Sequence, residues 1–347
     1  GIKMKEVVTF GEIMMRLSPP NNLRFSQTNT FEIVFGGGES NVAVSLANFG
    51  VPVSFVSQIP KNDIGDYAIM ELKKRNVRTD NILRKGNRLG IYFLETGAVS
   101  RGSKVIYDRS NSSFSQVDLN TINWSDVFKN CDWFHWTGIT PSISQNAFNV
   151  CLEALKVADQ MGITISTDLN YRKKLWKYGK SPSSAMSELV KYCDIILGNE
   201  EDVSMYFDIK PKNTDVIKGD QIDPNQYVEV SKSLMKKFPK AKKIITTLRG
   251  SINASNNLWS GVLYDGKKAF FSKTHNITHI VDRVGGGDSF MAGLIYGLRV
   301  LKDDQDALEF AAAASSLKHT IKGDFNLVTI DEVNRILSGD TSGRVSR

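Results

Sequence analysis

The sequence predicts an α/β fold with a doubly wound, mostly parallel sheet, helices on both of its faces, and a small additional β-sheet. Three observations support this prediction. Short apolar segments typical of buried strands alternate with helical segments, as in chains built from βαβ units. Residues 16–35 and 88–114 each alternate like half-exposed strands and contain no predicted helix, so together they predict the small sheet, which we call the lid. Two glycine-rich segments, one near each end of the chain, each precede a predicted helix.

The predicted elements follow one another without an internal repeat. The strands of the large sheet are short and apolar, and they cover residues 7–10, 53–56, 132–136, 163–167, 195–197 and 243–247, followed by a hairpin of 258–264 and 268–272. The helices cover residues 40–47, 63–75, 144–161, 183–192, 200–207, 227–238, 287–301, 305–320 and 330–337. We expect one domain of residues 4–338, in which the polar, turn-rich residues 208–225 form a surface insertion and 339–347 form a tail.

Composition and charge exclude several classes of protein. The chain has 347 residues and a formal net charge of +7, without the apolar run of about 18 residues that a membrane span needs. Its basic clusters are short and lack a nucleic-acid-binding motif, so we expect neither nucleic acid nor membrane as a partner, and a positive field that favours small anions. Cys131, Cys151 and Cys193 are far apart in the sequence, which predicts reduced thiols in a cytoplasmic protein. His275 and His279 have no acid beside them, which argues against a zinc site.

The run Gly285-Gly286-Gly287-Asp288 precedes an apolar, small-residue helix. Consecutive glycines can turn their N–H groups toward one point, and a helix N-terminus adds free N–H groups and a positive dipole end. The run therefore predicts a site for a phosphate or a developing anion. Asp288 itself fits two interpretations, an N-cap or a base that faces a hydroxyl beside a bound phosphoryl group.

The second run, Gly36-Gly37-Gly38, precedes the helix predicted at residues 40–47. Neither run fits the P-loop pattern, and no dinucleotide-binding fingerprint follows the first strand. Two glycine runs that each precede a helix instead predict a chain that binds two ligands, one of them phosphorylated.

Taken together, the two runs resemble the paired motifs of the ribokinase-like (PfkB) sugar kinases, and the resemblance extends from Met4 to about Leu337. The motifs are Gly36-Gly37-Gly38-Glu39-Ser40-Asn41 and Asp282-x-x-Gly285-Gly286-Gly287-Asp288-Ser289-Phe290. Within that family the chain is most similar to 2-keto-3-deoxygluconate kinases, through the segments 90–93, Tyr107-Asp108-Arg109, 135–141 and Asp168-Leu169-Asn170-Tyr171-Arg172. Three positions depart from the family pattern: Gly286 replaces alanine, Asp202 replaces glutamate, and Arg283 replaces a small or polar residue.

The resemblance implies phosphorylation of the terminal C6 hydroxyl of 2-keto-3-deoxygluconate by ATP, with Mg²⁺. Asp288 would accept the hydroxyl proton, and the N–H groups of Gly285, Gly286 and Gly287 would stabilise the transferring phosphoryl group. An ordinary aspartate pKa is sufficient for this role, because phosphoryl transfer has a loose transition state.

The resemblance also implies residues for each ligand. Arginine's planar fork suits the carboxylate of a sugar acid, so Arg109 and Arg172 are expected at that end of the substrate, although both could instead make surface ion pairs. The remaining sugar-site residues are Gly37, Gly38, Asn41, Tyr92, Tyr107 and Asn170. The nucleotide-site residues are Asn199, Thr247, Arg249, Gly250, Gly285, Gly287, Ala313 and Ser316.

The resemblance also bears on metal ions, on the oligomeric state and on alternative functions. Asp202 is either a helix cap or an indirect Mg²⁺ partner, and Asp282, with residues 321–323, resembles a site for a monovalent cation such as K⁺. The lid strands predict a homodimer or higher homo-oligomer. Three alternatives remain open: a neutral-sugar kinase such as a fructokinase, a non-catalytic sugar- or nucleotide-binding regulator, and a kinase for the epimer 2-keto-3-deoxygalactonate.

Overall fold

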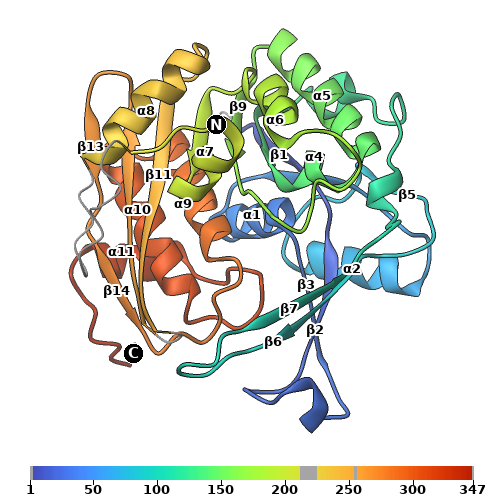
Figure 1. Ribbon diagram of the computed structural model, residues 1–347, viewed down its shortest axis with the longest axis horizontal. Helices are drawn as coiled ribbons and strands as arrows, with labels where there is room; N and C mark the ends of the chain where they lie inside the picture. Colours follow the sequence, from blue (N-terminus) through green and yellow to red (C-terminus); the bar gives the residue numbers. More distant parts are fainter. Residues whose placement is uncertain (1–2, 212–224, 254–255, 346–347) are drawn as a thin grey trace.

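The computed structural model describes residues 3–211, 225–253 and 256–345. Within them, a large sheet forms the centre of the molecule and a smaller sheet lies beside it (Figure 1). The strands of the large sheet are β1 (Glu6–Phe10), β4 (Val53–Ile59), β5 (Ile82–Arg84), β8 (Cys131–Thr137), β9 (Thr164–Asp168), β10 (Ile195–Gly198), β11 (Lys243–Asn253), β12 (Asn256–Tyr264), β13 (Ala269–Phe271) and β14 (His275–Thr278). The strands of the smaller sheet are β2 (Met14–Ser18), β3 (Glu32–Gly36), β6 (Ile91–Glu95) and β7 (Lys104–Asp108).

The large sheet has the strand order β13-β12-β11-β10-β9-β8-β1-β4-β5, and β14 pairs with β12. Neighbouring strands from β11 to β5 are parallel, whereas β12 runs antiparallel to β11, β13 and β14. Because β1 lies between β4 and β8, the chain builds the sheet outward in both directions from β1. The predicted doubly wound, mostly parallel sheet is confirmed.

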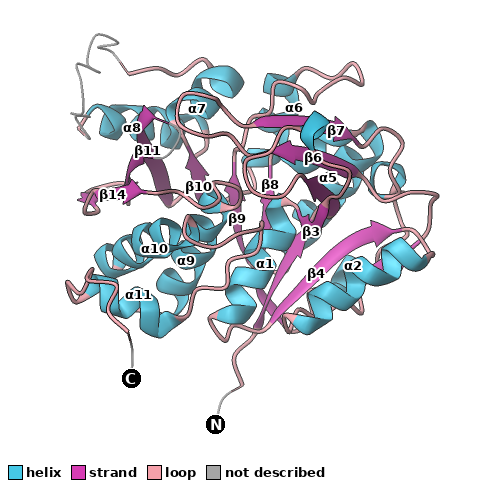
Figure 2. Ribbon diagram, turned by 90° about the horizontal axis from the view of Figure 1, so that it is seen from below, coloured by secondary structure: helices cyan, strands magenta, loops and turns pink. Residues whose placement is uncertain are grey.

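Helices cover both faces of the large sheet (Figure 2). Side chains of β1 alternate between the faces, so Val7 packs in one core and Val8 and Phe10 in the other. The helices of the Val7 face are α1 (Gly38–Asn48), α2 (Asp63–Lys74), α9 (Gly286–Val300), α10 (Asp304–Lys318) and α11 (Ile330–Leu337). Those of the opposite face are α3 (Trp124–Val127), α5 (Gln145–Gln160), α6 (Pro182–Val190), α7 (Glu200–Phe207) and α8 (Gln226–Lys237).

The lid has the strand order β3-β2-β6-β7, in which β2 and β6 are parallel and the outer pairs are antiparallel. Successive side chains of β2 point to opposite faces of the lid. Met15 packs into the core of the large sheet, whereas Met14 packs with Tyr92 and Leu94. The lid is therefore joined to the large sheet by its own side chains as well as by the chain connections.

Two helices begin in a different way from most of the long ones. The N-termini of α2, α5, α6, α7, α10 and α11 are each capped by an Asn, Ser, Asp or Thr side chain. In contrast, α1 and α9 follow Gly37 and Gly285, and neither has a side-chain cap. Their first N–H groups therefore lack the side-chain partner that the capped helices have.

The predicted helix boundaries agree with the structure to within two residues. The sequence does not predict β5, α3 or α4 (Ile139–Ile143), which are too short for a periodic pattern. Most of the predicted insertion at 208–225 lies outside the described residues, and the tail is described as far as residue 345. The three cysteines are buried and unpaired with one another, and no described helix is long and apolar enough to cross a membrane.

Candidate active site

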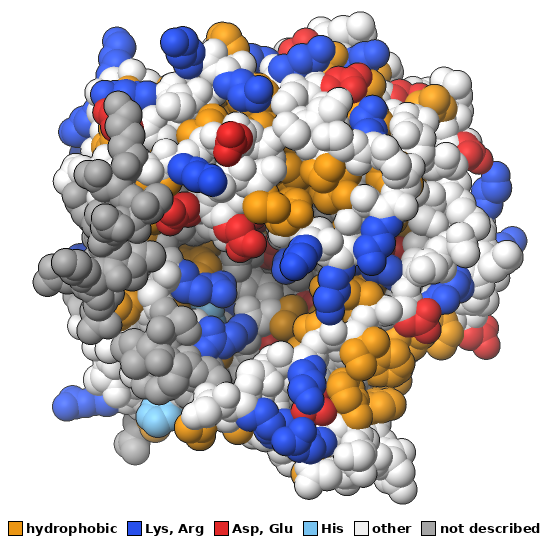
Figure 3. Space-filling model, in the orientation of Figure 1, with side chains coloured by type: hydrophobic (Ala, Val, Ile, Leu, Met, Phe, Trp, Pro, Cys, Tyr) orange, Lys and Arg blue, Asp and Glu red, His pale blue; other side chains and the backbone are white. Residues whose placement is uncertain are grey.

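A cleft of about 1020 Å³ lies between the lid, the N-termini of α1 and α9, and the carboxyl ends of the central strands. Glu12 follows β1, Asp168 ends β9 and Asn199 follows β10, and all three line the cleft. Open α/β sheets bind ligands at this edge. Figure 3 shows the cleft as a hollow bordered by Lys and Arg side chains, and the cationic residues that line it are Arg109, Arg172, Lys210, Arg249 and Arg283.

Most residues predicted for the site line this cleft. Those of the sugar set are Gly37, Gly38, Asn41, Tyr92, Tyr107, Arg109, Asn170 and Arg172. Those of the phosphoryl and nucleotide sets are Asn199, Asp202, Thr247, Arg249, Gly285, Gly286, Gly287 and Asp288. Four predicted residues are not part of the lining: Gly250, Asp282, Ala313 and Ser316. The roles of all these residues stay predictions at this point.

The N-termini of α1 and α9 meet in the cleft. Asn41, in the first turn of α1, donates from Nδ2 to Oδ2 of Asp288 across 2.8 Å, and its Oδ1 accepts from the N–H of Gly37. Asp288 lies in the first turn of α9, so this bond joins residues 247 positions apart in the sequence. We expected Asn41 to bind a sugar hydroxyl, but the structure gives it the further task of orienting the Asp288 carboxylate.

The N-terminus of α9 presents free amides to the cleft. Gly285 has φ of +84°, a left-handed conformation that favours glycine, and a Cβ there would lie 2.3 Å from the carbonyl oxygen of Asp324. The helical bonds begin with Ser289 N–H to Gly285 O, and Gly286 N–H donates to Arg283 O. The N–H groups of Gly287 and Asp288 precede this ladder, and no described atom lies within 4 Å of where a Cβ of Gly287 would be. These two amides are the ones best placed to meet an anion.

Burial raises the pKa of the Asp288 carboxyl to about 6, while the Asn41 hydrogen bond and the positive charge of Arg172 act in the opposite direction. The pKa of Asp288 is thus raised, although an ordinary aspartate pKa would already be sufficient for the predicted role. A carboxyl with a pKa nearer neutrality is a better proton acceptor, and at pH 7 it remains mostly ionised.

Gly286 stands where the family pattern has alanine. In this chain the imidazole ring of His319 occupies the space that the alanine methyl group would need. A Cβ at Gly286 would lie 2.8 Å from Cε1 of His319, at the end of α10. The ring is fixed in place, since its Nδ1 lies 2.7 Å from Ser315 O. The triple glycine and His319 are therefore complementary in shape, a relation that the local sequence could not reveal.

The lid side of the cleft carries two tyrosines and Arg109. Nε and Nη2 of Arg109 donate to Oε1 of the buried Glu12, at 3.1 and 2.5 Å, and the guanidinium lies 5.5 Å from the Tyr107 ring centre. The Tyr92 hydroxyl donates to Oδ2 of Asp324, another residue that lines the cleft. Arg109 is thus partly neutralised by Glu12, whose Oε2 has no hydrogen-bond partner among the described residues.

Arg172 lies in the loop that follows β9, and Asn170 in the same loop has a left-handed φ of +38°. The Arg172 side chain lines the cleft and makes no hydrogen bond or ion pair within the described part of the chain. Its charge lowers the pKa of Asp168, Asp202 and Asp288 relative to burial alone. Arg172 is therefore better placed than Arg109 to bind an anionic ligand.

On the nucleotide side, Asn199 and Asp202 form a capping box at the start of α7. Oδ2 of Asp202 accepts from Asn199 N–H and Oδ1 accepts from Tyr171 N–H, so both carboxylate oxygens bind backbone. Farther along this side, the guanidinium of Arg249 lies 5.0 Å from the Trp259 ring centre. The capping interpretation of Asp202 thus holds, and any effect on a metal would be indirect.

The oxygen donors of the cleft fit Mg²⁺, which prefers such ligands and retains several waters. Burial raises the pKa of Asp168 well above its ordinary value, and the negative charges of Asp202 and Asp288 raise it further. A divalent cation bound to phosphates nearby would relieve this repulsion. Within the described residues, no set of three or more His, Cys, Asp or Glu side chains could hold a metal ion.

Asp282 does not fit the expected monovalent-cation site. Its Oδ2 accepts from Arg16 Nη2 at 2.7 Å and from Gly323 N–H, and its Oδ1 accepts from Val284 N–H. The carboxylate is thus already occupied by a protein cation and two amides. The assignment of Asp282 to K⁺ is corrected on this ground.

Sequence reasoning missed Glu12, Arg16, Asp168, Asp324 and His319 as parts of the site or its support. Two local signals were present. Glu12 and Asp168 come directly at strand ends, where α/β ligand sites form. Arg16 interrupts an otherwise largely apolar strand, which is an unusual place for a charge.

A family model agrees with this geometry. Residues 4–329 match the model described as "pfkB family carbohydrate kinase". The chain belongs to this family. It is therefore a carbohydrate kinase, an enzyme that transfers a phosphoryl group to a hydroxyl group of a sugar, and the predicted family and enzyme class are confirmed.

Individual proteins similar to this kinase include enzymes named for keto-deoxy sugar acids. It is 30% identical to the 2-dehydro-3-deoxygalactonokinase of Haloferax volcanii over 97% of this chain and 98% of the relative. The crystal structure of 2-dehydro-3-deoxygluconokinase from Thermotoga maritima matches with a TM-score of 0.91 and 43% identity, covering 96% of this chain and all of that one. A fructokinase with bound ATP from Xylella fastidiosa matches with a TM-score of 0.77, over 97% and 99% of the chains, but at 20% identity it shows the fold alone.

Proposed function

We propose that this kinase transfers the γ-phosphoryl group of ATP to the C6 hydroxyl of 2-keto-3-deoxygluconate, also named 2-dehydro-3-deoxygluconate. The products are 2-keto-3-deoxy-6-phosphogluconate and ADP. The observation that carries the substrate assignment is Arg172, a cleft-lining guanidinium without an ion-pair partner among the described residues. Its charge suits the carboxylate of a sugar acid, a group that a neutral sugar lacks.

In the proposed mechanism Asp288 accepts the C6 hydroxyl proton as the hydroxyl oxygen attacks the γ-phosphorus. Asn41 holds the carboxylate in orientation, because its Nδ2 donates to Oδ2 of Asp288. The N–H groups of Gly287 and Asp288, at the positive end of α9, stabilise the charge on the transferring phosphoryl oxygens. Positioning and charge stabilisation dominate such a transfer, because its transition state is loose.

The nucleotide would occupy the side of the cleft that contains Thr247 and Arg249, with Gly250, Ala313 and Ser316 nearby. Arg249, Arg283 and Arg172 lie close enough for their charges to interact, since burial and then the charges of Arg283 and Arg172 lower the pKa of Arg249. Such a group of cations suits a triphosphate. When bound, Mg²⁺ would neutralise phosphate charge, with Asp168 and Asp202 influencing it through water.

The sugar-acid assignment is tested by a coupled ADP-release assay against 2-keto-3-deoxygluconate, its galactonate epimer, fructose and ribose. We expect the highest kcat/KM with one of the two keto-deoxy acids. A higher kcat/KM with fructose or ribose would overturn the assignment. The absence of turnover with every sugar would favour the non-catalytic alternative for this chain.

The galactonate epimer is a second candidate for a specific reason. The relative from Haloferax volcanii, which is 30% identical, has the name of a kinase for that epimer, whereas the structure with 43% identity has the name of a gluconate-type kinase. The epimers differ at one hydroxyl group, so the ratio of the two kcat/KM values in the same assay distinguishes them.

A homodimer formed through the lid is part of the proposal. The lid exposes apolar side chains, and Phe31, Ile33 and Ile106 have 42%, 44% and 54% of their surfaces accessible. A second lid packed on this face would cover them. Sedimentation equilibrium should give the mass of a dimer for the native chain, and Ile33→Asp with Ile106→Asp should give a monomer.

The buried, unpaired thiols also support a reducing compartment such as the cytoplasm.

A further inference from the structure

We infer that the Arg16 guanidinium acts as a built-in cation beneath the phosphoryl site, so that this kinase needs no monovalent metal ion there. Arg16 is a positioning residue, since it holds the loops from which the Gly287 and Asp288 amides project. The inference rests on the proposed phosphoryl site. Its first test measures ion binding, which requires no sugar.

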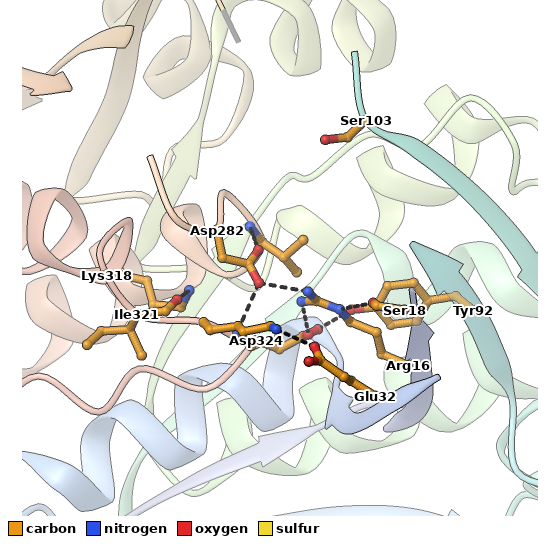
Figure 4. A network of polar contacts seen from close by, with 12 residues as sticks. Arg16, Ser18, Glu32, Tyr92, Ser103, Asp282, Lys318, Ile321 and Asp324 are labelled. Atoms are coloured by element: carbon orange, nitrogen blue, oxygen red, sulfur yellow. Dashed lines mark hydrogen bonds and ion pairs between the residues drawn. The ribbon is translucent and has the colours of Figure 1, made fainter. Parts of the chain in front are cut away.

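Arg16 joins two carboxylates that come from distant parts of the chain (Figure 4). Nη2 donates to Asp282 Oδ2 at 2.7 Å, and Nη1 donates to Asp324 Oδ1 at 3.0 Å. Nε donates to Ser18 Oγ, so each nitrogen of the guanidinium has a partner. Arg16, Asp282 and Asp324 are 2%, 6% and 3% exposed, which makes this a buried network and not a surface ion pair.

All four carboxylate oxygens of Asp282 and Asp324 already accept hydrogen bonds. The remaining Asp282 contacts are to the Val284 and Gly323 amides, and Asp324 Oδ2 accepts from the Tyr92 hydroxyl at 2.5 Å. The buried Lys318 ammonium donates to the Ile321 carbonyl oxygen at 2.9 Å, within the segment expected to help bind the ion. A K⁺ ion would have to displace a protein cation, at the expense of these hydrogen bonds.

The network is connected to the amides of the phosphoryl site by short backbone links. Asp282 holds Val284, the residue before Gly285, through its N–H group. The Asp324 carbonyl oxygen packs against Gly285, where a Cβ would be 2.3 Å away. The Asp282 carboxylate and the Asp324 backbone therefore both contact the loop immediately before Gly287 and Asp288. A shift of Asp282 or Asp324 would move those amides relative to the phosphoryl group.

Arg16 also joins the lid to the large domain. It lies on β2 and Tyr92 lies on β6, both lid strands, whereas Asp282 and Asp324 belong to the loops around α9 and α10. Figure 4 shows the lid side chains directed at the two carboxylates. Through Arg16, the lid strand β2 is thus joined to the residues that hold the amides of the phosphoryl site, a coupling that a freely exchanging ion could not provide.

The first experiment compares K⁺, Na⁺ and the bulky cation N-methyl-D-glucamine at equal ionic strength with the unaltered enzyme. We expect melting temperatures that agree within about 1 °C, since an ion that binds the native state specifically would raise the value. With whichever sugar is turned over, we expect kcat to vary by less than about two-fold. A melting temperature raised by K⁺ alone, or a kcat raised ten-fold or more by K⁺, would overturn the inference.

The second experiment replaces the cation. In Arg16→Met, kcat should fall about 100-fold, as on removal of a stabilising donor, while the KM values change little. Added guanidinium ion, at concentrations below those that unfold the protein, should restore part of the loss, and so should K⁺. Rescue distinguishes loss of the cation from general damage to the fold.

The matched control is Arg101→Met, because Arg101 is also a lid arginine paired with a buried carboxylate, that of Glu95, but lies outside the network. Its kcat should stay within about two-fold of the parent enzyme, without any effect of guanidinium. Equal loss in both variants, or an Arg16→Met variant that guanidinium and K⁺ both fail to rescue, would contradict the inference. If Arg16→Met does not fold, the ion comparison on the unaltered enzyme still decides it.

Discussion

The two glycine runs look alike in sequence but differ in what they do. Each has the pattern Gly-Gly-Gly, an acid and Ser, and each precedes a helix with no capping side chain. After the first run, Glu39 turns away from the cleft into the core, where Thr137 and Thr140 donate to its Oε2. After the second run, Asp288 faces the cleft and Asn41. Burial raises the pKa of both acids, to about 7 for Glu39 and about 6 for Asp288.

The glycines themselves also differ. In the first run the absence of Cβ allows close packing, since a Cβ at Gly37 would lie 2.0 Å from the Glu12 carbonyl oxygen. In the second run Gly285 provides a left-handed turn, and Gly287 leaves its amide open to the cleft. A sequence motif therefore identifies the place of a site, whereas the contacts decide whether a residue supports the fold or the chemistry.

The largest effect that separates the two acids is expected for Asp288→Asn. Loss of the base should lower kcat by about 10³- to 10⁴-fold, with little change in ATP affinity. In the parent enzyme, kcat/KM should rise with pH and level off above about pH 6, as Asp288 ionises. The measurement is steady-state kinetics together with nucleotide titration.

Asp306→Asn is the matched control, since Asp306 has the same position in the first turn of α10 but is exposed to solvent. It should leave kcat unchanged. Asp288→Asn should also be more stable than the parent at pH 8 by about 1 kcal/mol, because a raised carboxyl pKa lowers stability as pH rises through the folded-state value. Near-normal kcat in Asp288→Asn would remove Asp288 from the role of base.

The next largest effect is expected for Arg172, the arginine that we propose binds the sugar carboxylate. Arg172→Ala should raise KM for the sugar acid about 30-fold, equivalent to about 2 kcal/mol, because a charged hydrogen bond to the carboxylate is lost. KM for ATP should change much less. Lys173→Ala, in the same loop and exposed, is the control that keeps both values. Equal increases in both KM values for Arg172→Ala would assign this arginine to the nucleotide.

Replacing one glycine of each run by alanine tests whether the first run serves packing and the second run serves catalysis. Gly37→Ala should lower stability by about 3 kcal/mol, since a backbone oxygen cannot move aside. Gly287→Ala should keep or slightly increase stability, because alanine favours helix, and should lower kcat about ten-fold, since the methyl group enters the phosphoryl site. Chemical denaturation and kinetics on both variants would show this crossover. Loss of stability in Gly287→Ala without loss of kcat would contradict it.

The smallest effect on turnover is expected for Glu39→Gln. Because Glu39 lies outside the cleft lining, kcat should stay within about two-fold of the parent. The raised pKa of Glu39 adds stability below about pH 4.5 that is lost as pH rises through about 7. Glu39→Gln lacks this dependence, so its stability relative to the parent should increase between pH 5 and pH 8. A constant difference across that range would show that Glu39 does not titrate there.

Local patterns predict much of this molecule. Periodicity locates the helices to within two residues, and alternation locates the lid, because both follow from which faces are buried. The elements of three to five residues, β5, α3 and α4, are too short to form such a pattern. The glycine runs and strand ends similarly place most of the cleft lining.

What sequence reasoning could not provide are the pairings between distant residues. Arg109 meets Glu12 across 97 positions, and Arg16 meets Asp324 across 308. His319 fills the space of a side chain that Gly286 lacks. Each of these contacts depends on the final packing of helices and lid, and no local signal records it. They change the expected roles of Arg109, Asp282 and Gly286, and leave the expected family unchanged.

A crystal structure with 2-keto-3-deoxygluconate and a non-hydrolysable ATP analogue would test the central claim most directly. We predict that the C6 oxygen lies about 2.6–3.2 Å from a carboxylate oxygen of Asp288, in line with the γ-phosphorus, with the sugar carboxylate on Arg172. The amides of Gly287 and Asp288 should face the γ-phosphoryl oxygens. A sugar bound with its carboxylate away from Arg172, or a C6 hydroxyl beyond the reach of Asp288, would contradict the account.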